Sequence, residues 1–148
     1  MGNQLKKDVW VTLNSLSTHD GQADDPVELV THGRYYRKNG DYYICYAETE
    51  LTGGEPGRTT VRISDDMVTI LRFGPISGQL VFERGKKHLS HYDMEAGSLS
   101  MGVSTRKLEK NFDDCGGVLR LHYDVEVDNM LIGETALELQ VREAGGKQ

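Results

Sequence analysis

The sequence predicts an all-β protein in which antiparallel strands follow one another along the chain and close into a barrel of eight to ten strands. Three observations support this prediction. Apolar and polar residues alternate along about ten segments, short polar turns separate these segments, and no window keeps a helical period. The chain has 17 Gly and only 3 Pro, and the glycines fall mostly between the alternating segments. Such a meander must protect two edge strands, and closure into a barrel removes both.

The central stretch from Tyr42 to Gly74 gives the clearest signal. It contains two connections, of which the first is a Gly- and Pro-rich loop, Thr52–Gly57, that could act as a lid. The second, Ser64–Asp66, is short enough to require a hairpin. The alternation therefore predicts three antiparallel strands in a row: Tyr42–Leu51, Arg58–Ile63 and Met67–Phe73.

Further strands are predicted on both sides of this stretch. Asn39-Gly40 is the strongest hairpin signal, and Gly33 inside a long strand predicts a bulge or a sharp bend. The run Glu109–Asp114 is charged, Gly116-Gly117 predicts a break in the chain, and Asp128-Asn129 predicts a turn. The predicted strands are Asp8–Leu16, Val27–Lys38, Gln79–Glu83, Lys87–Asp93, Ser98–Leu108, Val118–Val127 and Leu131–Arg142.

The length of 148 residues fits one domain, which we expect to span residues 1–148 with an ordered core at 7–143 and a frayed tail at 144–148. A chain of this length buries roughly two thirds of its unfolded surface, so it requires no metal or disulfide for stability. The two cysteines form no CxxC motif. Cys45 lies within a strand pattern and is expected in the core as an inert thiol, whereas Cys115 is expected in a turn.

The charge balance argues against a protein that binds the phosphate backbone of nucleic acids. There are 23 acidic and 17 basic residues, a formal net charge of −6. The N-terminal segment MGNQLKKDVWV has no apolar run long enough for a signal peptide or a membrane anchor. We therefore expect a cytoplasmic protein that binds neither nucleic acid nor membranes.

A set of short motifs spread over nearly the whole chain resembles the YwiB-like family, bacterial proteins of unknown function. The resemblance implies a calycin-like, or lipocalin-like, β-barrel and no assigned activity, and calycin barrels suggest ligand binding only by analogy of fold. The chain departs from the family pattern at Asp93-Met94-Glu95 and at Gly133-Glu134-Thr135. The matching motifs are Gly33-x-Tyr35, Tyr42-Tyr43-Ile44-x-Tyr46-x-Glu48-x-Glu50, Thr52-Gly53, Thr59-Thr60, Val68-x-Ile70-x-Arg72-x-Gly74, Phe82-Glu83-x-Gly85, Tyr92, Gly97-x-Leu99, Gly102-Val103 and Leu119-x-Leu121-x-Tyr123.

The candidate ligand-binding residues are Tyr46, Glu48, Arg72 and Tyr92. Tyr46, Glu48 and Glu50 are spaced by two and share one face of a strand, and Arg72 shares its face with Val68 and Ile70. One interpretation is a polar cluster inside the barrel in which Arg72 holds Glu48, because a buried carboxylate needs a partner. The alternative is a set of ion pairs on the outer face, which we favour for Glu50 and Arg62. The seven tyrosines are explained by strand packing or by a tyrosine-lined cavity.

Other chemistry has less support. His88 and His91 point to opposite faces of a strand, and His122 belongs to a polar, outer face, so we expect no metal site and no cofactor. No phosphate loop or nucleophile elbow is present. The sequence thus predicts a protein that binds a small amphipathic molecule in the barrel. The alternatives are a protein-interaction or homodimerising module that uses the barrel rim or an edge, and a hydrolase or isomerase with Glu48 as acid or base.

Overall fold

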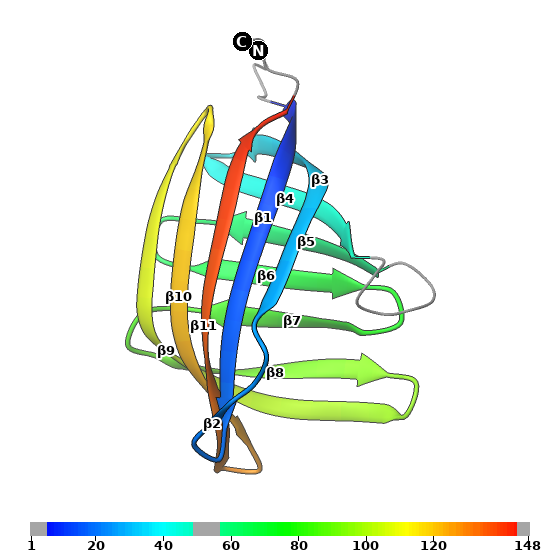
Figure 1. Cartoon of the computed structure of the whole chain (residues 1–148), viewed down its shortest axis with the longest axis vertical. Helices are drawn as coiled ribbons and strands as arrows, with labels where there is room; N and C mark the ends of the chain where they lie inside the picture. The colour runs from blue at the N-terminus through cyan, green and yellow to red at the C-terminus, as the bar shows by residue number, and fades with distance from the viewer. Residues whose placement is uncertain (1–5, 49–56, 145–148) are drawn as a thin grey trace.

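The computed structural model describes residues 6–48 and 57–144, except for the side chain of Glu48, and all its regular elements are strands. They follow the chain as a series of hairpins (Figure 1). The strands are β1 (Lys6–His19), β2 (Gln22–Ala23), β3 (Val27–Lys38), β4 (Asp41–Glu48), β5 (Gly57–Ile63), β6 (Val68–Phe73), β7 (Ser77–Phe82), β8 (Lys87–Met94), β9 (Gly97–Asp113), β10 (Gly116–Val127) and β11 (Met130–Glu143).

The strands form one antiparallel sheet that closes on itself. Each strand from β4 to β10 pairs with both of its neighbours in chain order, and β1 pairs with both β3 and β11. The closing ladder between β1 and β11 runs from Val9 opposite Glu143 to Thr18 opposite Glu134. These ten strands make a closed barrel, with the two-residue β2 attached to β1, and the predicted fold class is confirmed.

The barrel wall consists of two groups of strands that cross each other. The long strands β1, β9, β10 and β11 run along the long axis of the molecule, whereas β4 to β8 run across it (Figure 1). Side chains from both groups meet in one core, as expected from the period-two alternation. Among the fully buried side chains are Val9, Val11, Ile44, Val61, Phe82 and Leu119.

Two predicted turns show the expected backbone geometry. Asn39 and Gly40 have φ values of 54° and 86°, and Asp128 and Asn129 have values of 54° and 65°. Two consecutive left-handed residues match the twist of the flanking strands in a two-residue hairpin. Asn, Asp and Gly adopt this conformation with less strain than other residues, which explains why their positions could be predicted.

The predicted end of the strand Ser98–Leu108 is wrong, because β9 continues through the charged run to Asp113. Its second half pairs with the start of β10, with Asp113 opposite Gly116. Leu108 and Phe112 point toward the core and Glu109 and Asn111 toward the outer face, while Lys110 is exposed although it is opposite the buried Leu119. The chain reverses only at Asp114 and Cys115, which confirms the predicted turn at Cys115.

Gly33 lies where β3 begins to pair with β4, opposite Tyr46 on one side and Val9 on the other. Neither ladder shifts register at this point, so the predicted bulge is not formed there. A Cβ at Gly33 would come within 2.6 Å of the Cys45 carbonyl oxygen and 3.0 Å of Val11 Cγ2. The glycine therefore permits a close approach of three strands.

The expectation that Cys45 lies in the core is wrong. Tyr42, Ile44 and Tyr46 of β4 face inward, so Cys45 faces outward. Its side chain is half-buried beside Thr60, with 3.4 Å between Sγ and Oγ1.

A candidate ligand site in the barrel interior

A row of residues crosses five strands on the inner face of the barrel. Tyr46 of β4 is opposite Thr59 of β5, and Thr59 is opposite Arg72 of β6. Arg72 is opposite Gly78 of β7, which is opposite Tyr92 of β8. Directly paired residues project to the same side of a sheet, so the structure brings three predicted site residues onto one face. Tyr46 is buried, while Arg72 and Tyr92 are half-buried, and all three take part in side-chain interactions.

The fourth predicted residue, Glu48, continues this inner row along β4. Its backbone is opposite Gly57, but its side chain lies outside the described residues. The same holds for Glu50 and for the loop proposed as a lid, residues 49–56. The ion pair between Glu48 and Arg72 therefore stays a prediction.

Gly78 makes room for the ring of Tyr92. A Cβ at Gly78 would lie 2.1 Å from Tyr92 Cδ1 and 2.5 Å from the His91 carbonyl oxygen. Such distances are far below van der Waals contact, so the ring of Tyr92 occupies the space that any other residue at this position would fill. The absence of a side chain at Gly78 thereby allows the ring of Tyr92 to lie against the wall of the barrel.

Tyr123 of β10 reaches the same region from the opposite wall. Its side chain is 8% exposed, and burial raises the pKa of its phenol, as does the nearby phenol of Tyr92. A hydrogen bond with Thr135 and the positive charge of Arg72 lower that pKa. The ring also packs on Phe82, with 4.7 Å between centroids. Tyr123 belongs with the predicted site residues, although the sequence indicated only that it was one of several tyrosines in strands.

Three buried hydroxyl groups near this cluster have no hydrogen-bond partner among the described residues. They belong to Thr59, Ser90 and Thr105, which are 1%, 3% and 3% exposed. Thr59 lies in the row itself, Ser90 is two residues before Tyr92, and Thr105 is opposite Tyr123. An unpaired buried hydroxyl costs about 1–3 kcal/mol, so native proteins rarely keep several close together without a reason. These groups could not be predicted from the sequence, because threonine and serine also occur on the outer faces of strands.

The row lies near the strand ends that are connected by the β4–β5, β6–β7 and β8–β9 turns (Figure 1). Apolar side chains are exposed at this end, with Phe73 51%, Ile76 38% and Met94 38% exposed. Cavities of about 160, 250, 420, 540 and 580 Å³ occur elsewhere on the described surface, and Tyr46, Arg72 and Tyr92 line none of these five. Cavities bounded by residues 49–56 fall outside the described part of the chain.

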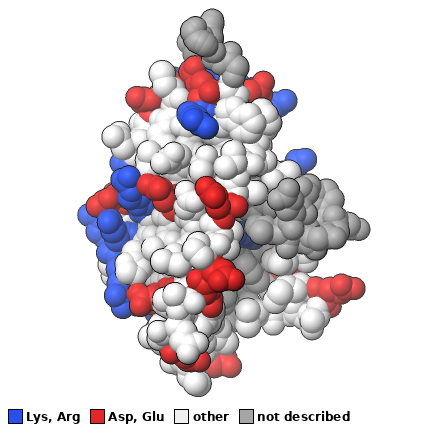
Figure 2. Space-filling model, in the orientation of Figure 1, with Lys and Arg blue, Asp and Glu red and all other residues white. Residues whose placement is uncertain are grey.

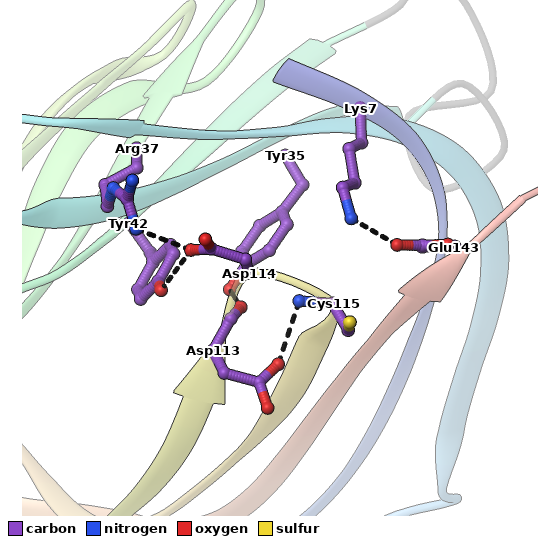
Figure 3. A network of polar contacts seen from close by, with 8 residues as sticks. All are labelled: Lys7, Tyr35, Arg37, Tyr42, Asp113, Asp114, Cys115 and Glu143. Carbon is purple, nitrogen blue, oxygen red and sulfur yellow. Dashed lines mark hydrogen bonds and ion pairs between the residues drawn. The ribbon is translucent and has the colours of Figure 1, made fainter. Parts of the chain in front are cut away.

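The other end of the barrel is closed by a polar network (Figure 3). The phenol of Tyr35 donates a hydrogen bond of 2.6 Å to the carbonyl of Asp113. Arg37 and Tyr42 both donate to Oδ1 of Asp114, at 2.6 and 2.8 Å. These bonds join the β3–β4 hairpin to the β9–β10 turn.

Two further contacts brace this closed end (Figure 3). The amide of Cys115 donates to the carboxylate of Asp113 at 2.8 Å, which shapes the β9–β10 turn. Lys7 and Glu143 form an ion pair between β1 and β11, which raises the pKa of Lys7.

Arg62 and His122 lie on the outer face, as predicted, whereas His88 is opposite the core residue Val103 and shares its face of β8 with Ser90 and Tyr92. Arg62 pairs with Asp41 at 2.8 Å and stands 5.9 Å above the ring of Tyr43. His88 and His122 contact Glu83 and Glu134 at 3.0 and 2.8 Å. Within residues 6–48 and 57–144, no three His, Cys, Asp or Glu side chains are grouped so that they could hold a metal ion.

Basic side chains of β9 and β10 gather along one side of the molecule (Figure 2). Most are paired with acids, such as Arg106 with Asp124 at 3.1 Å and Arg120 with Glu138 at 3.0 Å. This side therefore offers paired charges and no continuous basic surface. Across the described residues, no helix is long and apolar enough to cross a membrane.

Comparison with known proteins places this geometry in a family. The chain is similar to the uncharacterized β-barrel protein YwiB of Bacillus subtilis (strain 168), with 27% identity over 124 residues, 83% of this chain and 86% of that protein. The crystal structure of the ywiB protein from Bacillus subtilis has the same fold, with a TM-score of 0.84, 23% identity, and coverage of 95% and 94% of the two chains.

The resemblance inferred from the motifs is thereby confirmed. A family model described as a domain of unknown function, DUF1934, matches residues 11–139, which include the strands of the inner row. The chain therefore belongs to the DUF1934 family of β-barrel proteins.

Proposed function

We propose that this protein binds one small amphipathic molecule inside the barrel, with the polar part of the molecule at Tyr46, Glu48, Arg72 and Tyr92. The observation that carries the proposal is the row from Tyr46 to Tyr92 together with the unpaired hydroxyls that border it. These hydroxyls can donate to or accept from a bound polar group, which would recover the free energy lost on their burial.

The distribution of residues along the interior supports an amphipathic ligand. Toward the closed end, the inner positions next to the row are the buried apolar residues Ile44, Val61 and Ile70. A molecule that enters from the open end would meet apolar side chains at the rim, then polar groups, then the apolar core. An apolar tail in that core and a polar head at the row would each find a matching surface.

The proposed role is that of a binding protein in the cytoplasm, with no chemical step. The calycin-like architecture implied by the family resemblance is consistent with binding of one small molecule in a barrel, although this part of the argument is an analogy of fold. If Glu48 were instead an acid or base in a reaction, a Glu48→Gln variant would bind the ligand but lose its turnover.

Binding is tested with native mass spectrometry of protein purified from its own cells, which reports a retained small molecule directly. The identified compound, or the fluorescent amphiphile anilinonaphthalene sulfonate, is then titrated into wild-type protein and into Thr59→Val and Tyr92→Phe variants. We expect weaker binding by about 5- to 10-fold for each variant, the loss of about one hydrogen bond.

The matched control is Thr60→Val, since Thr60 is the neighbour of Thr59 on the outer face. Its affinity should equal that of the wild type. Equal affinities for Thr59→Val, Tyr92→Phe and wild type would overturn the interior site.

A further inference from the structure

The outer face of β1, β11, β10 and β9 carries a hollow of about 420 Å³. These four strands lie side by side in one wall of the barrel (Figure 1). A row of directly paired residues crosses the hollow, in which Leu16 is opposite Ala136 and Ala136 is opposite His122. The row ends at Lys107, which is opposite His122. All four residues line the hollow, and its volume falls within the range of about 300–1,000 Å³ that is typical of small-molecule sites.

The hollow exists because the middle of this row carries its smallest side chain. Ala136 ends at Cβ, whereas the next outward residues of β11 on either side are the long Glu134 and Glu138. Leu16 and Pro26 supply an apolar border, and the Leu16 side chain is 46% exposed. Pro26 comes beside Leu16 because the residue after it, Val27, pairs with β1. Part of the lining is therefore apolar surface that is open to solvent.

A β-bulge turns Lys107 toward the same side. Lys107 is opposite His122, but the next residue of β10 is opposite Thr105, so Arg106 is an extra residue in β9. Thr105 and Leu108 are buried, while the two basic residues between them are exposed. Strict alternation from Thr105 would direct Lys107 into the core. The bulge thus places an ammonium group beside the apolar lining.

This ammonium group has hydrogen-bond donors left for a ligand. Within residues 6–48 and 57–144, the ion pair of Lys107 is with Glu109 at 3.8 Å, which is too long for a hydrogen bond. The other charged residues of the lining are engaged with each other, because Nε of Arg120 donates to Glu138 at 3.0 Å. Lys107, Arg120 and Glu138 give the lining a formal charge of +1, in a chain whose net charge is −6.

We propose that this hollow binds a small organic anion, a molecule with one carboxylate group and an apolar body, at a site separate from the barrel interior. The ammonium group of Lys107 donates charge-assisted hydrogen bonds to the carboxylate. The apolar body covers Leu16, Pro26 and Ala136 and so removes their exposed surface from water. A cationic ligand would meet two basic side chains and a carboxylate already occupied by Arg120, so the lining selects negative charge.

Binding is tested with naphthoate, which is titrated into isotope-labelled wild-type protein and followed by the amide chemical shifts in NMR spectra. We expect a dissociation constant of about 1 mM or lower, which is reasonable for a ligand of this size. The largest shifts should occur at the amides of Leu16, Lys107 and Ala136. Naphthamide has the same shape without the charge and should bind about 5- to 10-fold more weakly.

Two variants test the two halves of the site. Lys107→Gln removes the ammonium group and should weaken naphthoate binding by about 5- to 10-fold, while naphthamide binding stays the same. Ala136→Leu fills the hollow and should abolish the binding of both compounds. Lys110→Gln is the matched control, because Lys110 is an exposed lysine of the same strand that does not line this hollow, and its affinity should equal that of the wild type.

The interior variant Thr59→Val separates this site from the one proposed inside the barrel. Thr59→Val should bind naphthoate as the wild type does, so loss of the interior proposal would leave this result unchanged. Naphthoate binding that is weakened by Thr59→Val and unaffected by Ala136→Leu would overturn the outer site. Equal affinities of Lys107→Gln and Lys110→Gln for naphthoate would overturn it too, as would wild-type spectra that do not change at millimolar naphthoate.

Discussion

The phenol of Tyr35 donates a hydrogen bond of 2.6 Å to the backbone carbonyl of Asp113, 78 residues away in the sequence. The Tyr35 side chain is fully buried, and its ring stacks on Tyr42 with 5.2 Å between centroids. This bond ties β3 to the end of β9 and so holds the closed end of the barrel together. Variants of Tyr35 therefore test whether this end of the barrel is held together as described.

Replacing Tyr35 with Phe keeps the ring and removes the hydrogen bond. The free energy of unfolding should fall by about 1 kcal/mol, because the Asp113 carbonyl loses a buried donor. Urea denaturation measures this change. Tyr43→Phe, on the outer face, is the matched control and should change the free energy by less than about 0.5 kcal/mol. Equal effects of the two variants would contradict the assigned role of Tyr35.

The stabilities of the wild type and of Tyr35→Phe should also differ in how they change at alkaline pH. Burial raises the pKa of Tyr35 above its ordinary value of 10.0, with further contributions from Tyr42 and Asp113. An unfolded chain ionises this phenol near pH 10 while the folded chain keeps it neutral, so folding stability decreases as pH rises above about 10. Tyr35→Phe removes this contribution, and its stability should decrease less steeply in that range when denaturation is repeated at several pH values. A parallel decline in both proteins would show that Tyr35 titrates normally.

A methyl group at Gly78 should disturb the inner row. In Gly78→Ala, the new Cβ would overlap the ring of Tyr92 at 2.1 Å, so ring or backbone must move. We expect a loss of about 1–3 kcal/mol in the free energy of unfolding, the usual effect of overpacking. Gly57→Ala is the control, since among the described residues its Cβ would meet only the Phe73 carbonyl, at an ordinary 3.5 Å. Thermal denaturation of both variants decides whether the close contact of Gly78 matters.

Thr59→Val should make the unliganded protein more stable. The variant keeps the shape of the side chain and removes a buried hydroxyl that has no partner, which should raise the free energy of unfolding by about 1 kcal/mol. Because the same change is expected to weaken ligand binding, stability and affinity should move in opposite directions. A destabilised Thr59→Val protein would indicate that the hydroxyl has a structural role.

The hydrogen bond to Asp114 contributes to the raised pKa of Tyr42. Burial is the main reason why the pKa of Tyr42 is raised, and the hydrogen bond to Asp114 raises it further. In Asp114→Asn the pKa of Tyr42 should therefore fall, though not to its ordinary value, and spectrophotometric titration of the tyrosines would detect it. The free energy of unfolding should change by about 0.2–1 kcal/mol, because the Arg37–Asp114 pair is largely exposed. An unshifted tyrosine titration would contradict the contact.

Local patterns were sufficient for most of the fold. The bounds of β3 agree with the prediction, and the hairpin at Asn39-Gly40 follows from residues that adopt a left-handed backbone. The inward direction of Arg72 also follows from its spacing to Val68 and Ile70. The strand was predicted to end at Leu108 because the residues after it are charged, although a strand accommodates charge wherever its side chains are exposed.

The candidate site was predictable only where it depends on the spacing within one strand. Tyr46, Arg72 and Tyr92 are aligned by ladders between strands, and their shared direction could be inferred from each alternation. The contribution of Tyr123 depends on closure of the barrel, which brings β10 opposite β6 and β8. Likewise, nothing local distinguishes the buried Thr59 from Thr60 beside it on the outer face.

The pairing of the first strand with the last has a consequence for how the protein is made. Val9 meets Glu143 only after β11 has been synthesised, whereas every other ladder joins consecutive strands or, for β1 and β3, strands separated only by the two-residue β2. Before β11 is synthesised, the nascent chain on the ribosome can therefore form only an open sheet, in which β1 and β10 are the edge strands. Pairing of β11 with β1 closes the barrel, so a chain that terminates before residue 130 forms a sheet that cannot close.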